Sequence, residues 1–203
     1  MFTRTRILLA SAVVVFILMA AMLILSKRCP EEGLALTQNA RTLHEQKNRT
    51  TLPQNQEFNP QISLSELLRP GDDRSRWSTL HAARIQGYVV AVAYARPEAT
   101  NCFVPWRRDI HINVATRMDA PLNEQVVLEV TPNLSDWAAQ QGLDWSETAL
   151  RAELVGHWCE FEGWMYFDIG HADQAENTAP NNPTNWRATS WEIHPITKMR
   201  VVR

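Results

Sequence analysis

The chain has 203 residues, of which 45% are hydrophobic, 21% charged and 8% aromatic. This composition is typical of a globular protein and excludes wholesale disorder. The three cysteines are too few for a disulfide-built scaffold. The chain contains neither the P-loop motif nor G-x-G-x-x-G, so nothing supports a nucleotide-binding enzyme of either class.

The formal net charge of −2 is unevenly distributed along the chain. Residues 1–28 contain four basic and no acidic residues, so the rest has 16 basic against 22 acidic residues and a net charge of about −6. An acidic domain argues against broad, sequence-independent binding of phosphates, which requires a dense surface of Lys and Arg. This balance still leaves room for a small basic cleft.

The strongest single pattern is an uncharged run of twenty residues, 7–26. In a helix this run is about 30 Å long, the thickness of the hydrocarbon core of a bilayer. We therefore expect residues 1–28 to form a retained, single-pass transmembrane anchor. A cleaved signal peptide is the alternative, because Arg4 and Arg6 also fit its basic start. Basic residues flank both ends of the run, and their distribution favours a folded part outside the cytoplasm, as in a periplasmic domain.

The next segment, residues 29–61, is polar, and its few apolar residues show no sustained period. We interpret it as a tether with a helical turn near residues 34–43. The folded domain is expected over residues 62–203. It opens with Ser63-Leu-Ser-Glu66, which fits a capping box at the start of a short helix.

Most of the remaining chain has the apolar and polar alternation of β-strands. A helix that begins at Asp144 or Ser146 separates the third of these strands from the fourth. The expected strands cover residues 84–96, 109–116, 125–131, 157–169 and 187–202. Three strands, a helix and two strands is the order of the OB-fold, a five-stranded Greek-key barrel. We therefore predict a mainly β protein with a five-stranded OB-like barrel, a fold that binds oligonucleotides or oligosaccharides.

From about residue 85 onward the chain resembles a poorly characterised family of small exported bacterial proteins with OB-like folds. Three short matches carry part of the resemblance: D-I-H-I at 109–112, V-L-E-V-T-P at 127–132 and G-W-M-Y-F-D at 163–168. The most specific match is R-A-T-S-W-E-I-H-P at 187–195. The resemblance implies the fold and an exported location but no settled reaction, and it covers neither the anchor nor the tether.

Alternation along the second, third and fifth strands directs ionisable side chains to one face. These strands are neighbours in a closed OB barrel, so side chains on one face of them can touch. Four side chains are expected on one outer patch: His111, Glu129, Glu192 and His194. Asp168 and His171 follow the fourth strand and lie within reach of it.

A patch of imidazoles and carboxylates suits two kinds of chemistry. The metal-ligand candidates, for a divalent ion such as zinc or manganese, are His111, His171, His194 and Asp168. The catalytic candidates, for a metal-assisted phosphodiesterase or a metal-free general base with its orienting carboxylate, are His111, Glu129, Glu192 and His194. The alternative is structural: pairs such as His111–Glu129 would tie strands together, each contributing about 0.2–1 kcal/mol.

Aromatic and basic residues supply candidate contacts to a polar ligand. Trp106, Arg107 and Arg108 form a basic-aromatic cluster between the first two strands, and a surface turn is the alternative. Trp164 and Tyr166 are placed to stack on bases or sugar rings, unless a helix covers them. Arg187 is placed to clamp a phosphate or a carboxylate. The polar loop of residues 171–186 is long enough for a lid or a mobile segment.

The cysteines leave two interpretations open. Cys102 and Cys159 would approach each other where the first and fourth strands pair, so a disulfide is one interpretation and a free, buried Cys159 is the other. Cys29 is interpreted as an inert thiol.

Three functions follow from these patterns. The first hypothesis is a module that binds a polar oligomer, such as single-stranded nucleic acid or a glycan. The second is a metal-assisted hydrolase, so enzymatic activity stays open. The third is an interaction domain that holds a protein partner near the cell membrane. A bound transition metal would favour the second, and aromatic stacking without metal would favour the first.

Overall fold

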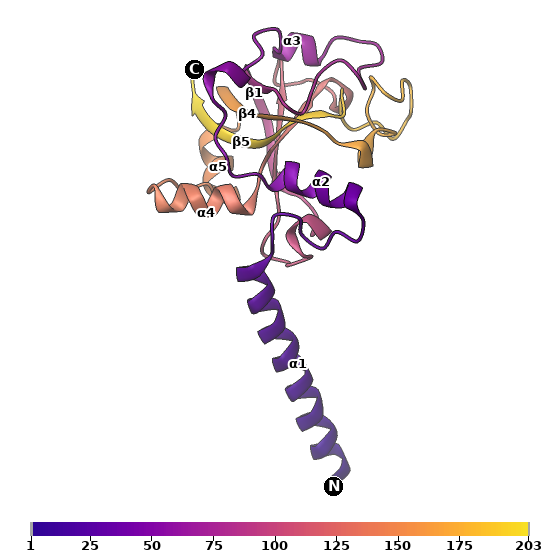
Figure 1. Cartoon of the computed structure of the whole chain (residues 1–203), viewed down its shortest axis with the longest axis vertical. Helices are drawn as coiled ribbons and strands as arrows, with labels where there is room; N and C mark the ends of the chain where they lie inside the picture. Colours follow the sequence, from indigo (N-terminus) through magenta and orange to yellow (C-terminus); the bar gives the residue numbers. More distant parts are fainter. Residues whose placement is uncertain (1, 203) are drawn as a thin grey trace.

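Five strands of the chain close into a barrel in the order β1-β2-β3-β5-β4. Figure 1 labels three of them, β1, β4 and β5. The structure is a computed structural model and describes residues 2–202, leaving aside the side chains of residues 2–7, 9–10, 22 and 25–28. The strands are β1 (Ala82–Tyr94), β2 (Ile110–Ala115), β3 (Val126–Val130), β4 (Trp158–Phe167) and β5 (Trp191–Val201). The mainly β fold and its five strands are confirmed, and the strand order is consistent with an OB-like barrel.

The long strand β1 allows the barrel to close. Its first half pairs with β4 and its second half with β2, and the register shifts at a bulge between Val89 and Ala91. β3 and β5 complete the barrel through a parallel pairing of Leu128 with Ile193. Gly163 of β4 lets β5 approach closely, because a Cβ there would lie 2.3 Å from the carbonyl oxygen of Pro195.

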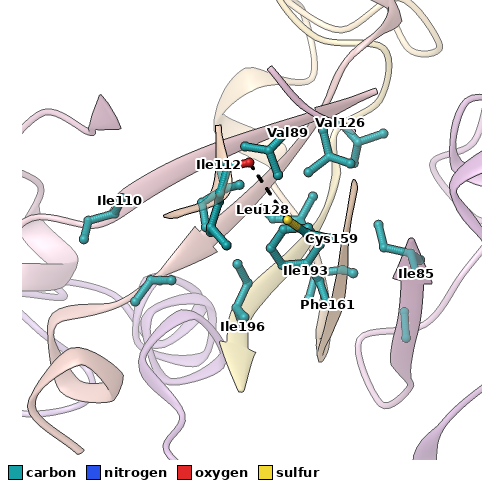
Figure 2. Close-up of a cluster of buried hydrophobic side chains, with 14 of the residues drawn as sticks. Ile85, Val89, Ile110, Ile112, Val126, Leu128, Cys159, Phe161, Ile193 and Ile196 are labelled. Atoms are coloured by element: carbon teal, nitrogen blue, oxygen red, sulfur yellow. Dashed lines mark hydrogen bonds between the residues drawn. The ribbon is translucent and has the colours of Figure 1, made fainter. Parts of the chain in front are cut away.

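The predicted alternation fills the barrel interior with aliphatic side chains, as Figure 2 shows. Ile112 of β2, Leu128 of β3 and Phe161 of β4 are all completely buried there. Because successive side chains of a strand point to opposite faces, the residues between them face away from the interior. His111 and Glu129 are therefore outside the barrel wall, as the sequence predicts.

Three short helices adjoin the barrel, one before β1 and two between β3 and β4. α3 (Leu64–Leu67) begins at Ser63, whose Oγ accepts the N–H of Glu66, as the sequence predicts. α5 (Glu147–Leu154) begins after Ser146, one of the two predicted caps. α4 (Pro132–Gln140) was not predicted. Thr131 caps it and proline suits its first turn, so Pro132 starts a helix as well as ending a strand.

α1 (Phe2–Arg28) extends away from the barrel (Figure 1). Among the residues that the structure describes, no helix combines the length and the hydropathy needed to cross a membrane. The transmembrane anchor predicted over residues 7–26 thus gains no support from the structure.

Residues 29–51 differ from the tether expected there, because they fold against the barrel; we call them the N-terminal cover. They contain α2 (Gln38–Asn48). The cover is fastened to L12, the loop of residues 95–109: Nδ2 of Asn48 donates to the carbonyl oxygen of Thr100 at 2.9 Å, and Nζ of Lys47 lies 2.9 Å from Oε2 of Glu98. The folded part of the chain therefore begins near residue 29, before the expected boundary at residue 62.

A disulfide between Cys29 and Cys102 also fastens the cover, with their Cα atoms 5.9 Å apart. The interpretation of Cys29 as an inert thiol is therefore wrong. Cys102 does not pair with Cys159, which is a free thiol buried in the barrel core (Figure 2). Sequence reasoning placed Cys29 on a loose tether, where no partner could be anticipated.

The disulfide generates a first prediction. It links residues 73 positions apart, so replacing Cys29 and Cys102 together with Ser frees the unfolded chain and should lower the free energy of unfolding by about 2–4 kcal/mol in urea titrations. The control Cys159→Ala should keep the cross-link. Non-reducing peptide mapping should join Cys29 to Cys102 in the wild type, and a peptide joining Cys102 to Cys159 would contradict this.

Candidate functional site

A polar pocket opens between L12 and L45, the loop of residues 168–190, beside the outer face of β2. Its volume is about 510 Å³, within the range of small-ligand sites. Its charged and aromatic lining residues are Tyr94, Arg96, Glu98, His111, His171 and Trp186. OB-folds bind their ligands on this face and with these two loops. The pocket is therefore the first candidate for a binding site.

His111 connects the pocket to the barrel wall. It pairs in register with Glu129 of β3, and its Nε2 lies 3.1 Å from Oε1 of that carboxylate. Burial by itself would lower the pKa of His111, but the charge of Glu129 and the hydrogen bond raise it to about 9. His111 therefore carries a positive charge at neutral pH and presents it to the pocket.

A buried network of charged side chains continues behind His111. Nδ1 of His194 lies 3.3 Å from Oε2 of Glu129 and 3.1 Å from Oε2 of Glu192. Burial alone would lower the pKa of His194, but the Glu129 charge and the hydrogen bond to Glu192 raise it. Burial also raises the pKa of Asp109, which ends L12 beside the network. The structure thus brings His111, Glu129, Glu192 and His194 together.

Glu129, Glu192 and His194 are not on an outer surface, which corrects the sequence prediction; of the four, His111 alone lines the pocket. Glu129 is only 2% exposed, and Glu192 and His194 are completely buried. They point away from the barrel interior, but the N-terminal cover lies over them. Lys47 of the cover is buried as well; desolvation by itself would lower its pKa, but Glu129 and Glu98 raise it well above its usual value.

Arg187 extends the network to the other side of the pocket. It is completely buried, with Nη1 2.5 Å from Oε1 of Glu192 and Nη2 3.3 Å from Oδ2 of Asp168. Asp168 in turn lies 2.5 Å from Nδ1 of His171. Burial would raise the pKa of Asp168, but His171 and Arg187 lower it to about 2. Because Arg187 is inside the protein, it holds protein carboxylates and does not reach a ligand directly.

The ion pairs form one continuous chain that starts and ends at the pocket. In order, its members are His171, Asp168, Arg187, Glu192, His194, Glu129 and His111. The hydrogen bond to Asp168 raises the pKa of His171 despite partial burial. The acids behind both histidines that line the pocket therefore favour their protonated forms.

The predicted metal ligands do not converge on one point. His111 and His194 share Glu129, whereas His171 is paired with Asp168 on the far side of Arg187. A different set of possible metal ligands comes together. Asp109, Glu129 and His194 each offer one ligand atom, and these three atoms lie within 4.8 Å of one another.

The N-terminal cover buries two of the predicted ligand-stacking residues. Nε1 of Trp164 donates to the carbonyl oxygen of Thr51 at 2.7 Å, and the Arg49 guanidinium lies 4.8 Å from the indole centre. Tyr166 packs against His194, with ring centres 5.5 Å apart, and Nζ of Lys47 from the cover lies 5.8 Å from the centre of its ring. Both aromatic side chains are therefore buried, as the alternative interpretation expected. They lie under the N-terminal cover, a segment that the sequence did not suggest for this role.

The predicted basic-aromatic cluster lies in a separate groove against α4. Nη1 of Arg107 is 2.7 Å from Oδ2 of Asp136, and the Arg108 guanidinium lies 4.3 Å from the ring centre of Tyr94. Trp106 is 54% exposed. These residues line the other side of L12 and do not reach the pocket.

Sequence reasoning missed several residues that shape the site. Asp109 could have been found, because alternation places it on the same face as His111 two positions later. Arg96, Glu98 and Trp186 lie in loops, where no period indicates direction. No sequence pattern indicated that Lys47 is near the site, because its segment was interpreted as a tether.

Comparison with family models, with curated proteins and with solved structures finds no match to this chain. The resemblance to exported OB-like proteins therefore stays a prediction from the sequence.

Two arginines provide a matched test of the network. Replacing Arg187 with Met leaves two buried carboxylates without their cation and should lower the free energy of unfolding by about 3–5 kcal/mol. Arg200 forms an exposed pair with Glu160, at 2.8 Å, and Arg200→Met should cost about 0–1 kcal/mol. Urea unfolding measures both. Equal, small losses would show that the buried network does not hold the domain together.

Proposed function

We propose that this chain is a binding protein whose pocket between L12 and L45 takes an acidic group of a polar ligand. The observation that carries the proposal is the clustering of Arg96, His111 and His171 around one pocket. In a domain with a net charge of about −6, such a cluster is a local exception that favours an anion.

The charges around the pocket leave it positive. Glu98, the acidic residue among its lining, is already paired with Lys47 at 2.9 Å. A guanidinium and the protonated imidazole of His111 donate hydrogen bonds and suit a carboxylate or a phosphate, and the hydrogen bond to Asp168 favours the protonated form of His171 as well. Because His111 and His171 are each paired with a carboxylate, their side chains contribute positive charge to the pocket in a fixed orientation.

The aromatic residues of the pocket have different roles. Trp186 is held between neighbours, with the His111 ring parallel to it at 6.1 Å and the Arg187 guanidinium 4.0 Å from its centre. It is therefore a fixed wall. Tyr94 is 44% exposed and offers a surface against which a sugar ring or a base can pack.

We favour an acidic glycan over single-stranded nucleic acid as the ligand. A nucleic acid carries one charge per nucleotide and gains affinity from many phosphate contacts. This domain offers one small cationic pocket on an acidic surface, which suits a sparsely charged oligomer better.

We further propose that the domain works outside the cytoplasm and is attached to the cell membrane by residues 7–26. The Cys29–Cys102 disulfide supports the location, because disulfides persist mainly in oxidising compartments. The uncharged run in the sequence is the support for the attachment.

A hydrolase is the second candidate, supported by the pairing of His111 with Glu129. A histidine that lines a pocket with a carboxylate behind it is the arrangement of a general base and its orienting group. The pKa of about 9 favours binding over this role, because it keeps His111 protonated at pH 7 and unable to accept a proton.

Calorimetric titration tests the proposal with three probes: a uronic-acid oligosaccharide, a neutral oligosaccharide of equal length and a single-stranded oligonucleotide. The acidic glycan should bind most tightly. Arg96→Met and His171→Asn should each weaken its binding by about tenfold, or about 1.4 kcal/mol, because each removes one cationic donor.

The matched control is Lys198→Met, which removes an exposed cation of β5 that does not line the pocket. It should leave affinity unchanged. Equal binding of acidic and neutral glycans, or an equal loss in the control, would contradict the proposal. Tighter binding of the oligonucleotide would replace the glycan with nucleic acid as the ligand.

A further inference from the structure

We propose that Asp109, Glu129 and His194 bind a divalent transition metal ion directly behind the pocket. They come from the end of L12, from β3 and from β5, so closure of the barrel is what assembles them. Their ligand atoms lie within 4.8 Å of one another, so one ion can reach all three after small side-chain movements.

Unpaired atoms in this cluster point to a missing ligand. Oδ2 of Asp109, Oε2 of Glu129 and Nε2 of His194 are buried and accept or donate no hydrogen bond within the described part of the chain. Oε2 of Glu129 does lie 3.3 Å from Nδ1 of His194, but without hydrogen-bond geometry. Buried polar atoms in folded proteins nearly always have a partner, so three unpaired atoms in one cluster need an explanation.

The second polar atom of each proposed ligand is already held. Nδ2 of Asn101 donates to Oδ1 of Asp109 at 3.0 Å, and Nε2 of His111 lies 3.1 Å from Oε1 of Glu129. Nδ1 of His194 lies 3.1 Å from Oε2 of Glu192. Metal sites in proteins are built in this way, with an outer group that orients each ligand and leaves the other atom for the ion.

Charge favours a cation at the same place. Lys47 makes its ion pair with Glu98 and acts on Glu129 and Asp109 through longer-range attraction, and none of the described cations forms a direct ion pair with Asp109. A divalent ion would place a positive charge in direct contact with this carboxylate. One imidazole nitrogen with two carboxylate oxygens suits zinc, manganese or iron(II), whereas calcium and magnesium prefer oxygen alone.

Metal analysis of the full-length, tag-free chain tests the site. The protein is stripped with a chelator, dialysed against Zn²⁺ or Co²⁺ and measured by elemental mass spectrometry. Wild type should retain about one ion per chain, and the Co²⁺ form should show visible absorption bands of a protein-bound ion. Glu129→Gln and His194→Asn should each lose the ion.

His171→Asn is the matched control, since this histidine lines the pocket but lies outside the proposed ligand set; it should retain the ion. Wild type without stoichiometric metal or without the Co²⁺ bands would overturn the proposal, whatever the variants do. Equal metal in wild type, Glu129→Gln and His194→Asn would overturn it too. Circular dichroism checks that each variant is folded, and Asp109→Asn replaces any that is not.

Discussion

The rest of this structure depends on burying carboxylates on the outer face of β3 and β5. Glu129 and Glu192 would lose too much solvation energy if they were buried without cations. The structure meets this constraint with four side chains: His111 and His194 lie beside Glu129, Arg187 pairs with Glu192, and Lys47 comes from the N-terminal cover. The N-terminal cover matters for this reason, because it brings Lys47 to the network and keeps water out.

The same constraint shapes the pocket. The chain of ion pairs ends in His111 on one side and His171 on the other, so acids inside the protein favour the protonated forms of the two histidines that line the pocket. An otherwise acidic domain thereby gains a small positive site where OB-folds bind their ligands. The proposed metal ion would bind at Asp109, Glu129 and His194, where Asp109 forms no direct ion pair with any described cation.

Local patterns predicted what depends on neighbours in the sequence. Alternation found all five strands and the shared face of His111, Glu129 and His194, because each strand directs its side chains with a period of two. The cover was not predictable in this way. Lys47 reaches its partners across about fifty residues of sequence, and the Cys29–Cys102 disulfide spans 73, so neither leaves a periodic signal.

The central claim is that Lys47 is a buried cation surrounded by carboxylates. NMR titration of the chain with ¹³C-labelled lysine tests it directly, because the chain has only three lysines. Lys47 should lose its proton at a pH above that of an ordinary lysine side chain, since Glu129 and Glu98 outweigh the effect of burial. A Lys47 that titrates below the ordinary range of lysine would contradict the account, because burial would then outweigh the carboxylates.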